Sequence, residues 1–498
     1  MKWLIPILAL AACDKDNADY CDEPMVHCLA GVCNQTTHEC EPGDGGMFPD
    51  FAGTDLSLDF APAPDLIGFD LTLVCGACSG TTPICEAGQC ISCGNAPNGG
   101  EAACLALSSA TPHCLASGAC GQCRDGNDCS DVSKSICDTT THMCRGCTSD
   151  GECSSKVCDL TPGSPTLGQC VTGVIYVDCM NGSDTADGKS LATANQKISK
   201  GIANAKAAGY PVVRISSNGG GSCAGENLTV MDNITLVGET GATIKPNGNN
   251  NPALDVKGAA VVVVRNLIFS SGIGTNGNGI TCETSGSLTV LQCTVTNNTQ
   301  YGIEDNGCPM ITVDRSFIGA LTGGQGSQQG GLYLAHNFRV TNNFIIKNGN
   351  NTGGPSGGGV VIMSPATATP RDFNSNTVVN NLGSGPGAGV SCPATAPVVV
   401  LNSILFNNTA TAVLSESTCP TSYCGDDATA ELNQSNNVTL STSNSPGFAA
   451  VGDYHIGAGS PLRGKGTTNG VSDHDYDGQP RPDPSTGMVD IGADQYYP

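Results

Sequence analysis

The stretch VLQCTV, residues 290 to 295, is one of several copies of a single pattern between residues 230 and 413. The pattern is an apolar residue, two variable residues, a small polar residue, one variable residue and a second apolar residue. A repeat of this kind, at intervals of 23 to 33 residues, predicts a solenoid in which each copy is one coil. The small polar column comprises Asn233, Asn266, Cys293, Ser316, Asn343, Asn376 and Ser403.

A second mark follows each copy at a variable distance, and it is a Gly-apolar or Ala-apolar step. Apolar residues two apart point to the same side of a strand, and β-branched runs broken by Gly and Asn favour short strands and tight turns. We therefore predict an all-β chain in which the residues inserted between the two marks form loops that project from the coils. The steps are Gly279-Ile280, Gly302-Ile303, Gly331-Leu332, Gly359-Val360, Gly389-Val390 and Ala412-Val413.

These coils resemble the right-handed parallel β-helix repeat family, whose members include pectate lyases. The resemblance implies a right-handed parallel β-helix in which inward Asn side chains bond one another along the stack. It also implies which residues a catalytic site would contain. Lyases of this superfold use a Lys or Arg base with Ca²⁺ held by carboxylates, and the hydrolases use clustered carboxylates.

Composition limits the partners of this 498-residue chain, whose formal net charge is −24 and whose pI is near 4.4. Nucleic acids and anionic lipids need a basic face, so we expect neither as the main partner. Acidic polysaccharides would also be repelled unless Ca²⁺ or a local basic patch intervened.

The N-terminal sequence predicts an export signal. Residues 1–12 form a short apolar signal peptide, and the sequence Leu10-Ala11-Ala12-Cys13 resembles a bacterial lipobox, which implies lipidation of Cys13. An ordinary signal peptide with an incidental cysteine is the alternative. The prediction is an exported protein, lipid-anchored to a bacterial membrane, either the outer membrane or the cell surface.

The other 28 cysteines divide into 4 in residues 21–40, 16 in residues 75–170 and 8 in residues 179–424. Even numbers in an exported chain favour disulfides, so we predict a cysteine-rich module at 13–40 and disulfide-rich repeats at 75–170. An acidic, Pro-rich linker at 41–74 separates them. Repeated Cys-x-x-Cys pairs with nearby histidines leave a zinc-binding array open. Cys179 and Cys223 are predicted to bond, and Cys293 to be a structural, inward residue.

Both ends of the predicted solenoid carry recognisable closing elements. Residues 171–227 should supply a first strand and a helical cap, with the helix over 194–208. Residues 228–424 supply the coils, and 425–498 a last coil whose ending resembles the choice-of-anchor type of secreted β-helix protein. Asp473, Asp475 and Asp477 match the opening of a Ca²⁺-binding loop. The alternative is that Arg481 closes the coil by pairing with Asp490 or Asp494.

A candidate catalytic face follows from the Gly-apolar steps. If the apolar residue points inward, Glu283 and Glu304 point outward on neighbouring coils, with Asp305, Tyr333 and His336 close by. We expect no Lys or Arg in that column, and a solvated face is the alternative. Two basic residues, Arg265 and Arg315, are predicted to share another column, where they bind an anionic sugar or, as the alternative, are solvated or pair with Asp314.

Two functions follow from this reading. The preferred one is a non-catalytic β-helix, displayed beyond a disulfide-rich stalk, that binds glycan or a cell-surface protein. The alternative is a polysaccharide lyase or glycoside hydrolase that uses Glu283, Glu304 and Asp305. Tyr333 and His336 would bind ligand in either case, and calcium is the one cofactor that the sequence suggests.

Overall fold

In the computed structural model the chain forms two compact units, residues 1–74 and residues 75–498. The residues described are 31–34, 39–42, 75, 78–161, 163–217, 221–283, 286–320, 326–350, 357–365, 367–383, 388–391, 400–410, 438–439, 446–468 and 470–498. The predicted signal peptide, Cys13 and nearly all of the acidic linker lie outside them. In the first unit, β1 (Gly31–Asn34) and β2 (Glu39–Pro42) pair antiparallel. No helix among the described residues combines the length and apolar character needed to cross a membrane.

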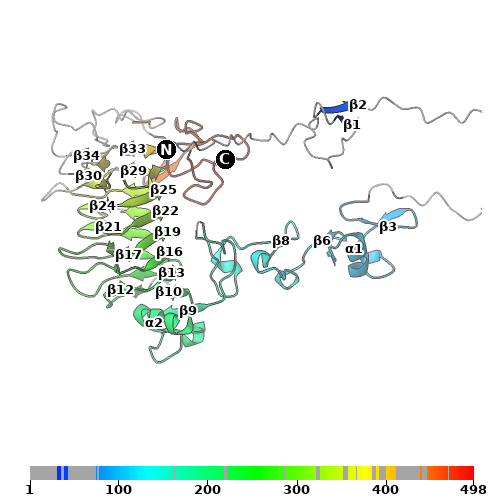
Figure 1. The fold of residues 1–498 in the computed structure, drawn as a ribbon, viewed down its shortest axis with the longest axis horizontal. Helices are drawn as coiled ribbons and strands as arrows, with labels where there is room; N and C mark the ends of the chain where they lie inside the picture. The colour runs from blue at the N-terminus through cyan, green and yellow to red at the C-terminus, as the bar shows by residue number, and fades with distance from the viewer. Residues whose placement is uncertain are drawn as a thin grey trace, which may run out of the picture. The chain divides into compact units, whose positions relative to one another are not determined.

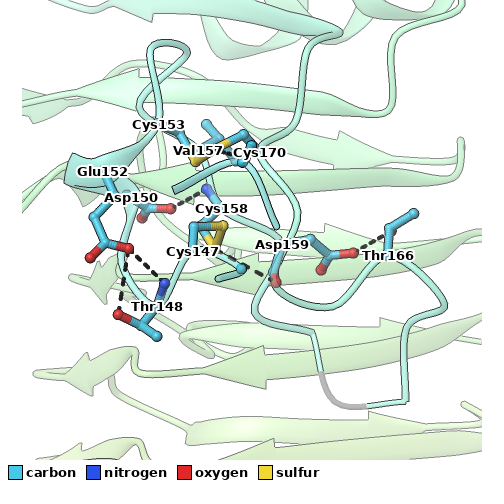
Figure 2. The surroundings of a disulfide bond; sticks show 12 residues. Cys147, Thr148, Asp150, Glu152, Cys153, Val157, Cys158, Asp159, Thr166 and Cys170 are labelled. Carbon is cyan, nitrogen blue, oxygen red and sulfur yellow. Dashed lines mark hydrogen bonds between the residues drawn. A yellow bond between two sulfur atoms is a disulfide. The ribbon is translucent and has the colours of Figure 1, made fainter. Parts of the chain in front are cut away.

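Four small modules, each closed by two disulfides, occupy residues 75–170. In every module the first cysteine bonds the third and the second bonds the fourth, so the two bridges interlace; Figure 2 shows the fourth module. Disulfide formation is confirmed, and it removes the thiolates that a zinc site would need. The bonds are Cys75–Cys85, Cys78–Cys90, Cys93–Cys114, Cys104–Cys120, Cys123–Cys137, Cys129–Cys144, Cys147–Cys158 and Cys153–Cys170.

Short antiparallel hairpins hold the third and fourth cysteines of these modules opposite each other. Three Cys-x-x-Cys pairs, which begin at Cys90, Cys120 and Cys144, join the last cysteine of one module to the first of the next. They are therefore links between modules and not redox or metal motifs. The regular elements are β3 (Ile84–Glu86), β4 (Gln89–Ile91), α1 (Gly100–Leu107), β5 (His113–Cys114), β6 (Cys120–Gly121), β7 (Ile136–Asp138) and β8 (Met143–Arg145).

A parallel β-helix of three sheets follows, as predicted (Figure 1). Sheet 1 contains β9 (Val174–Asp178), β10 (Val212–Ser216), β13 (Ile234–Gly238), β16 (Val261–Arg265), β19 (Ser287–Leu291), β22 (Met310–Asp314), β25 (Asn337–Thr341), β28 (Arg371–Asn374) and β32 (Val400–Leu401). Sheet 2 contains β11 (Ser222–Cys223), β14 (Thr243–Ile244), β17 (Ile268–Ser270), β20 (Thr294–Thr296), β23 (Phe317–Gly319), β26 (Phe344–Ile346), β29 (Thr377–Val379), β33 (Ile404–Phe406) and β35 (Val438–Thr439). Sheet 3 contains β12 (Leu228–Val230), β15 (Leu254–Val256), β18 (Ile280–Glu283), β21 (Tyr301–Asn306), β24 (Gly330–Leu334), β27 (Gly358–Ile362) and β31 (Val390–Ser391).

The predicted polar column runs along the interior between sheets 1 and 2. Asn343 donates its backbone N–H and its side-chain Nδ2 to Asn376 Oδ1, both at 3.0 Å, and Ser316 N donates to Asn343 Oδ1 at 2.8 Å. Cys293 continues the column as a buried thiol, and burial raises its pKa to about 12. These contacts confirm the column from Cys293 to Ser403, where Asn376 N donates to Ser403 Oγ.

The first two members of the predicted column are wrong. Asn266 lies in register with Gln292, not with Cys293, and it occupies a left-handed turn position with φ of 56°. Buried Leu267 therefore fills the column in that coil. Asn233 precedes β13, and its Oδ1 accepts from Val261 N at 2.8 Å. Asparagine favours both turns and stacks, so residue type alone placed the column one residue off at Asn266 and at the wrong end of the sheet 1 strand at Asn233.

A second interior ladder, which the sequence analysis missed, lies between sheets 2 and 3. Asn348 N donates to Asn381 Oδ1 at 2.8 Å, and Asn381 N donates to Asn408 Oδ1 at 3.0 Å. Each of these asparagines follows a member of the first ladder by five residues, which is the signal that would have revealed it. Ser327 and Asn298 extend this ladder toward the N-terminal coils.

From β18 to β31, a glycine stands at the start of each strand of sheet 3 because the backbone there passes close to the next coil. A Cβ on Gly302 would lie 2.6 Å from the carbonyl oxygen of Gly331, and one on Gly331 would lie 2.6 Å from that of Gly359. The next residue in each coil, such as Ile303, is fully buried. The predicted Gly-apolar steps from Gly279-Ile280 to Gly389-Val390 therefore mark the strands of sheet 3, and the predicted step Ala412-Val413 lies outside the described residues.

The N-terminal end is covered by α2 (Ile198–Ala208), the helix predicted over 194–208. Its residues Ile198, Ile202 and Ala205 join the same apolar cluster as the interior of the first coils. A disulfide joins Cys179 and Cys223, as predicted. The helix thus continues the core over the open end of the coil.

Two further segments cover the outside of the β-helix. Residues Val157 and Val171 of the fourth module pack near Val212 and Val237 of sheet 1, and Asp150 Oδ1 binds Arg265 Nη2 at 2.7 Å. The C-terminal segment contains the hairpin of β36 (Phe448–Ala450) and β37 (Asp453–Ile456) and packs on the outer face of sheet 2. A small parallel pair, β30 (Leu382–Gly383) and β34 (Thr409–Ala410), lies between neighbouring coils.

Candidate functional site

The two glutamates predicted to face outward lie on neighbouring strands of sheet 3. Glu304 of β21 lies opposite Thr281 of β18, while Glu283 lies opposite Asn306. The two glutamates are therefore offset by two residues along the strands, in adjacent outward columns. Both side chains are partly exposed. The structure places them on one face, as the Gly-apolar steps indicate.

One outward column contains most of the polar and aromatic groups. Asp255 of β15, Thr281, Glu304 and Tyr333 of β24 are register partners in four successive strands. The ring of Tyr301 lies 5.2 Å from that of Tyr333, with an interplanar angle of 45°. Strands are spaced by about 4.8 Å, so the Cα atoms of Asp255 and Glu304 lie about 9.6 Å apart.

A lysine lies on this face, contrary to the sequence expectation. Lys257 Nζ binds Asp255 Oδ2 at 3.0 Å and Glu283 Oε1 at 3.3 Å. The prediction was wrong because the preceding coil begins with Ala253-Leu254 instead of a Gly-apolar step. An Ala-apolar step was accepted at residue 412, so the same signal would have revealed Asp255 and Lys257.

Burial makes two of these carboxyl groups weaker acids. Burial is the largest influence on the pKa of Glu304 and raises it. Asn278 Nδ2 donates a hydrogen bond to Glu304 Oε2 at 2.6 Å, which lowers the same pKa by a smaller amount. Burial also raises the pKa of Asp255, whose Oδ1 is buried without a hydrogen bond from any described residue. Two carboxyl groups with raised pKa values, Asp255 and Glu304, therefore lie on the same face as the ion-paired carboxylate of Glu283.

Asp305 does not belong to this face, because it is buried. Its Oδ1 accepts from Gly307 N and Cys308 N, and its Oδ2 accepts from Ala335 N and His336 N at 2.8 and 2.7 Å. His336 Nδ1 also lies 3.1 Å from Asp305 Oδ1. A carboxylate with this many backbone donors organises the ends of β21 and β24, which is a structural role.

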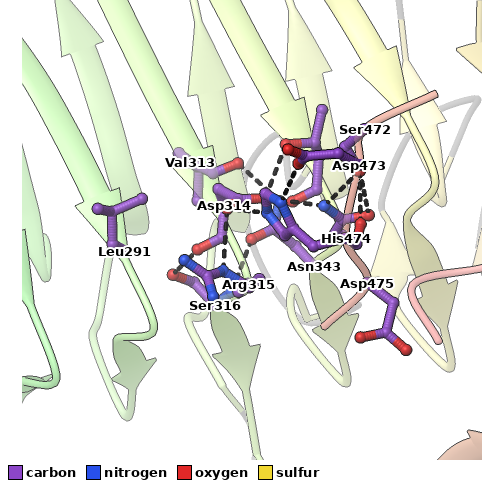
Figure 3. Close-up of polar contacts among 12 residues, drawn as sticks. Leu291, Val313, Asp314, Arg315, Ser316, Asn343, Ser472, Asp473, His474 and Asp475 are labelled. Atoms are coloured by element: carbon purple, nitrogen blue, oxygen red, sulfur yellow. Dashed lines mark hydrogen bonds and ion pairs between the residues drawn. The ribbon is translucent and has the colours of Figure 1, made fainter. Parts of the chain in front are cut away.

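A groove of about 570 Å³ lies on the outer face of sheet 1, beside residues 470–474. Asp314 of β22 lies at its edge and accepts from His474 Nε2 at 2.8 Å and Thr341 Oγ1 at 2.9 Å (Figure 3). Burial would raise the pKa of Asp314, but His474 and Arg315 outweigh it and lower that pKa. The other ring nitrogen of His474 lies 2.6 Å from Asp473 Oδ1. These contacts fasten the C-terminal segment to sheet 1.

The two arginines predicted to share a column do not share one. Arg265 is in register with Leu291 and Asp314, whereas Arg315 follows in the left-handed turn position. Arg315 Nε pairs with Asp314 at 3.1 Å, which confirms one of the two alternatives. Arg265 is buried under the fourth module and pairs with Asp150.

The structure does not bring the proposed calcium ligands together. Asp473 binds His474, and buried Asp475 accepts from Gln479 N at 2.7 Å and Gln495 N at 3.0 Å. Asp477 instead lies 3.4 Å from His455 Nε2. This contact comes first among the causes that raise the pKa of His455 to about 9.

Arg481 does not close the coil through an ion pair with Asp490 or Asp494 among the described residues. It is buried, and its Nη1 donates to the carbonyl of Gly492 at 3.0 Å. Asp490 and Asp494 instead accept from backbone groups, Gly464 N and Ile456 N. The coil end is therefore held mainly by hydrogen bonds to the backbone.

Comparison with known proteins supports the fold and its hand. A family model for a right-handed β-helix region matches residues 252–435. The crystal structure of pectate lyase Pel9A aligns with 65% of this chain and 96% of its own, at 14% identity and a TM-score of 0.38. A search of curated proteins finds no match. The family-model match and the sheet topology together show that the chain contains a right-handed parallel β-helix. The structural likeness, at this TM-score, carries no argument.

Proposed function

We propose that this chain is an exported, lipid-anchored protein that binds glycans through the outer face of sheet 3. The observation that carries the proposal is the column of Asp255, Glu304 and Tyr333, with Tyr301 packed beside Tyr333. Carboxylates accept hydrogen bonds from sugar hydroxyls, and aromatic rings pack against the C–H faces of sugars. Four successive strands repeat at about 4.8 Å, which suits an extended, repeating ligand.

Export and anchoring are supported by the sequence at residues 1–13, where an apolar segment precedes Cys13. The disulfides of residues 75–170 agree with an oxidising compartment. A surface location at the outer membrane or cell exterior would present sheet 3 to extracellular glycans.

Glycoside hydrolysis is a second candidate, because burial raises the pKa of both Glu304 and Asp255. Hydrolysis needs one carboxyl group that donates a proton and one carboxylate that assists attack at the sugar. Glu304 is placed for the first role, and Glu283, ion-paired with Lys257, for the second. Asp305 is not available for either, since its oxygens are occupied by backbone donors.

Lyase chemistry through Lys257 is less well supported. Two carboxylates lie within 3.3 Å of its Nζ, and they raise the pKa of the ammonium group. A lysine that abstracts a proton must be neutral, so this environment opposes the role of a base.

The test is a glycan array with the full-length protein, followed by assays for new reducing ends and unsaturated products. Glu304→Gln keeps the shape of the side chain, and Tyr333→Ala removes the aromatic surface. Asp372→Asn, on the outer face of sheet 1, is the matched control. We expect Tyr333→Ala to weaken glycan binding at least tenfold and Asp372→Asn to leave it unchanged.

The outcomes separate the two candidates. Binding without product, lost in Tyr333→Ala, supports a binding protein. New reducing ends that disappear in Glu304→Gln, while binding is kept, support a hydrolase. Glycan binding that is equally strong in wild type and Tyr333→Ala would show that sheet 3 is not the binding face.

A further inference from the structure

Three segments of the C-terminal element converge on one histidine. His455 belongs to β37, Asp477 to the turn at residues 473–478, and Asp494 to the closing residues of the chain. A ring nitrogen of His455 and one oxygen of each aspartate all lie within 4.8 Å of one another. We propose that these three side chains bind a divalent transition-metal ion such as Zn²⁺, independently of any glycan on sheet 3.

The spacing of the ligand atoms fits a zinc ion. His455 Nε2 lies 3.4 Å from Asp477 Oδ2. Zinc bonds to nitrogen and oxygen are about 2.0–2.2 Å long, and the edge of a tetrahedron with such bonds is about 3.4 Å. The imidazole and the carboxylate can therefore share one metal ion with little movement of either side chain.

The histidine is already oriented as a metal ligand. Asp453 Oδ1 lies 2.5 Å from His455 Nδ1, on the side of the ring opposite Asp477. Metal-binding histidines in proteins usually donate their second ring N–H to a carboxylate, which fixes the tautomer and the ring orientation. Asp453 thus binds Nδ1 and leaves Nε2 as the nitrogen that faces Asp477.

A separate observation concerns the carboxylate of Asp494, which has one oxygen available for a cation. Asp494 is only 5% exposed, and its Oδ2 accepts a hydrogen bond from Ile456 N at 2.9 Å. Its Oδ1 receives no hydrogen bond from the residues that the structure describes. This oxygen therefore has a free lone pair with which it could bind a cation beside His455.

The donor set favours zinc over calcium. Calcium takes six to eight oxygen ligands, whereas an imidazole with two carboxylates suits zinc and its neighbours in the first transition series. Asp477 is partly exposed, with 48% of its side chain accessible, so water can complete the coordination.

Such an ion would connect β37, the 473–478 turn and the chain end over the outer face of sheet 2. Tyr454 and Ile456, which flank His455, pack on that face with Phe344 and Ile346. The ring of Phe344 lies 5.0 Å from that of His455. The metal would therefore fasten the C-terminal element to the β-helix.

The test is calorimetric titration of the untagged, fully oxidised, full-length protein with ZnCl₂ after treatment with EDTA. CaCl₂ and MgCl₂ are titrated in parallel. We expect one high-affinity zinc ion per chain and a zinc-dependent rise in the thermal midpoint. His455→Gln and Asp494→Asn should weaken zinc binding at least tenfold and abolish the rise. His336→Gln, which alters a histidine beside Asp305 in another part of the chain, should leave both unchanged.

Asp477→Asn provides a variant at an exposed position, in case replacements at the buried residues prevent folding. It should fold normally and also weaken zinc binding at least tenfold. Absence of zinc binding, or zinc binding that His455→Gln, Asp494→Asn and Asp477→Asn leave intact, would overturn the site. Calcium binding stronger than zinc binding at the same residues would overturn the choice of ion.

Discussion

Replacing Asn376 by alanine tests the interior ladder directly. The side chain is fully buried, and its Oδ1 accepts from both Asn343 N and Asn343 Nδ2, while its Nδ2 donates to Val340 O at 2.8 Å and Asn374 O at 3.0 Å. Alanine would leave Asn343 N without its acceptor and would remove the side-chain donor of Val340 O and Asn374 O, whereas Asn343 Nδ2 would keep Val313 O and Thr341 O as acceptors. A buried polar group that loses its partner costs about 1–3 kcal/mol, so we expect a loss of about 2–5 kcal/mol in the free energy of unfolding.

The assay is urea unfolding followed by far-UV circular dichroism, with Asn306→Ala as the control. Asn306 is exposed on sheet 3, and its replacement should change stability by no more than about 0.5 kcal/mol. A double variant, Asn343→Ala with Asn376→Ala, removes both members of the contact. Because one change already breaks the shared bonds, the double variant should cost about 1 kcal/mol less than the sum of the two.

The ladder argument would be refuted by either of two results. One is an Asn376→Ala protein that unfolds at the same urea concentration as Asn306→Ala. The other is strict additivity in the double variant, which would show that Asn343 and Asn376 do not depend on each other.

Three further predictions concern other contacts. Burial alone would lower the pKa of His474, but the contact with Asp314 outweighs burial and raises that pKa. The contact therefore stabilises the fold fully below about pH 6.5, the usual pKa of histidine. This stabilisation is lost as the pH rises through the pKa that His474 has in the folded protein. Limited proteolysis should therefore cut residues 470–474 faster at about pH 9 than at about pH 6, and equal rates would contradict this. Asp150→Ala leaves buried Arg265 without its partner and should destabilise docking of the fourth module by about 3–5 kcal/mol, measured as faster protease release of residues 75–170. Cys293, buried with a pKa of about 12, should resist iodoacetamide in the native protein and react after unfolding, and rapid native labelling would contradict its interior position.

The coil pattern was sufficient to predict the fold because its periodic marks reflect two strict requirements of the backbone. The Gly-apolar step marks a close approach between coils, and the small polar residue follows a left-handed turn position. The register failed at Asn233 and Asn266, because asparagine suits both the turn and the stack. Where the column residue is Leu267, no polar residue marks the position.

The candidate site was only partly predictable. Glu283 and Glu304 were placed correctly by counting from a glycine, but Lys257 was missed because its coil begins with alanine. Local counting cannot predict a contact such as Asp314 with His474, which joins residues 160 apart. That contact depends on how the C-terminal segment crosses the coil, and no periodicity encodes the path of that segment.

The interlaced disulfides of residues 75–170 have a mechanical consequence. Consecutive modules are joined by only two residues between cysteines, and within each module a sulfur–sulfur bond bypasses the backbone from the first cysteine to the third. A pulling force along this region would pass through the first-to-third disulfide of a module and then through the short hairpin between its third and fourth cysteines. Only that hairpin, and not the rest of the module, could then be drawn out before the force reaches the next module. The disulfides would therefore limit how far the region extends under tension until they are reduced.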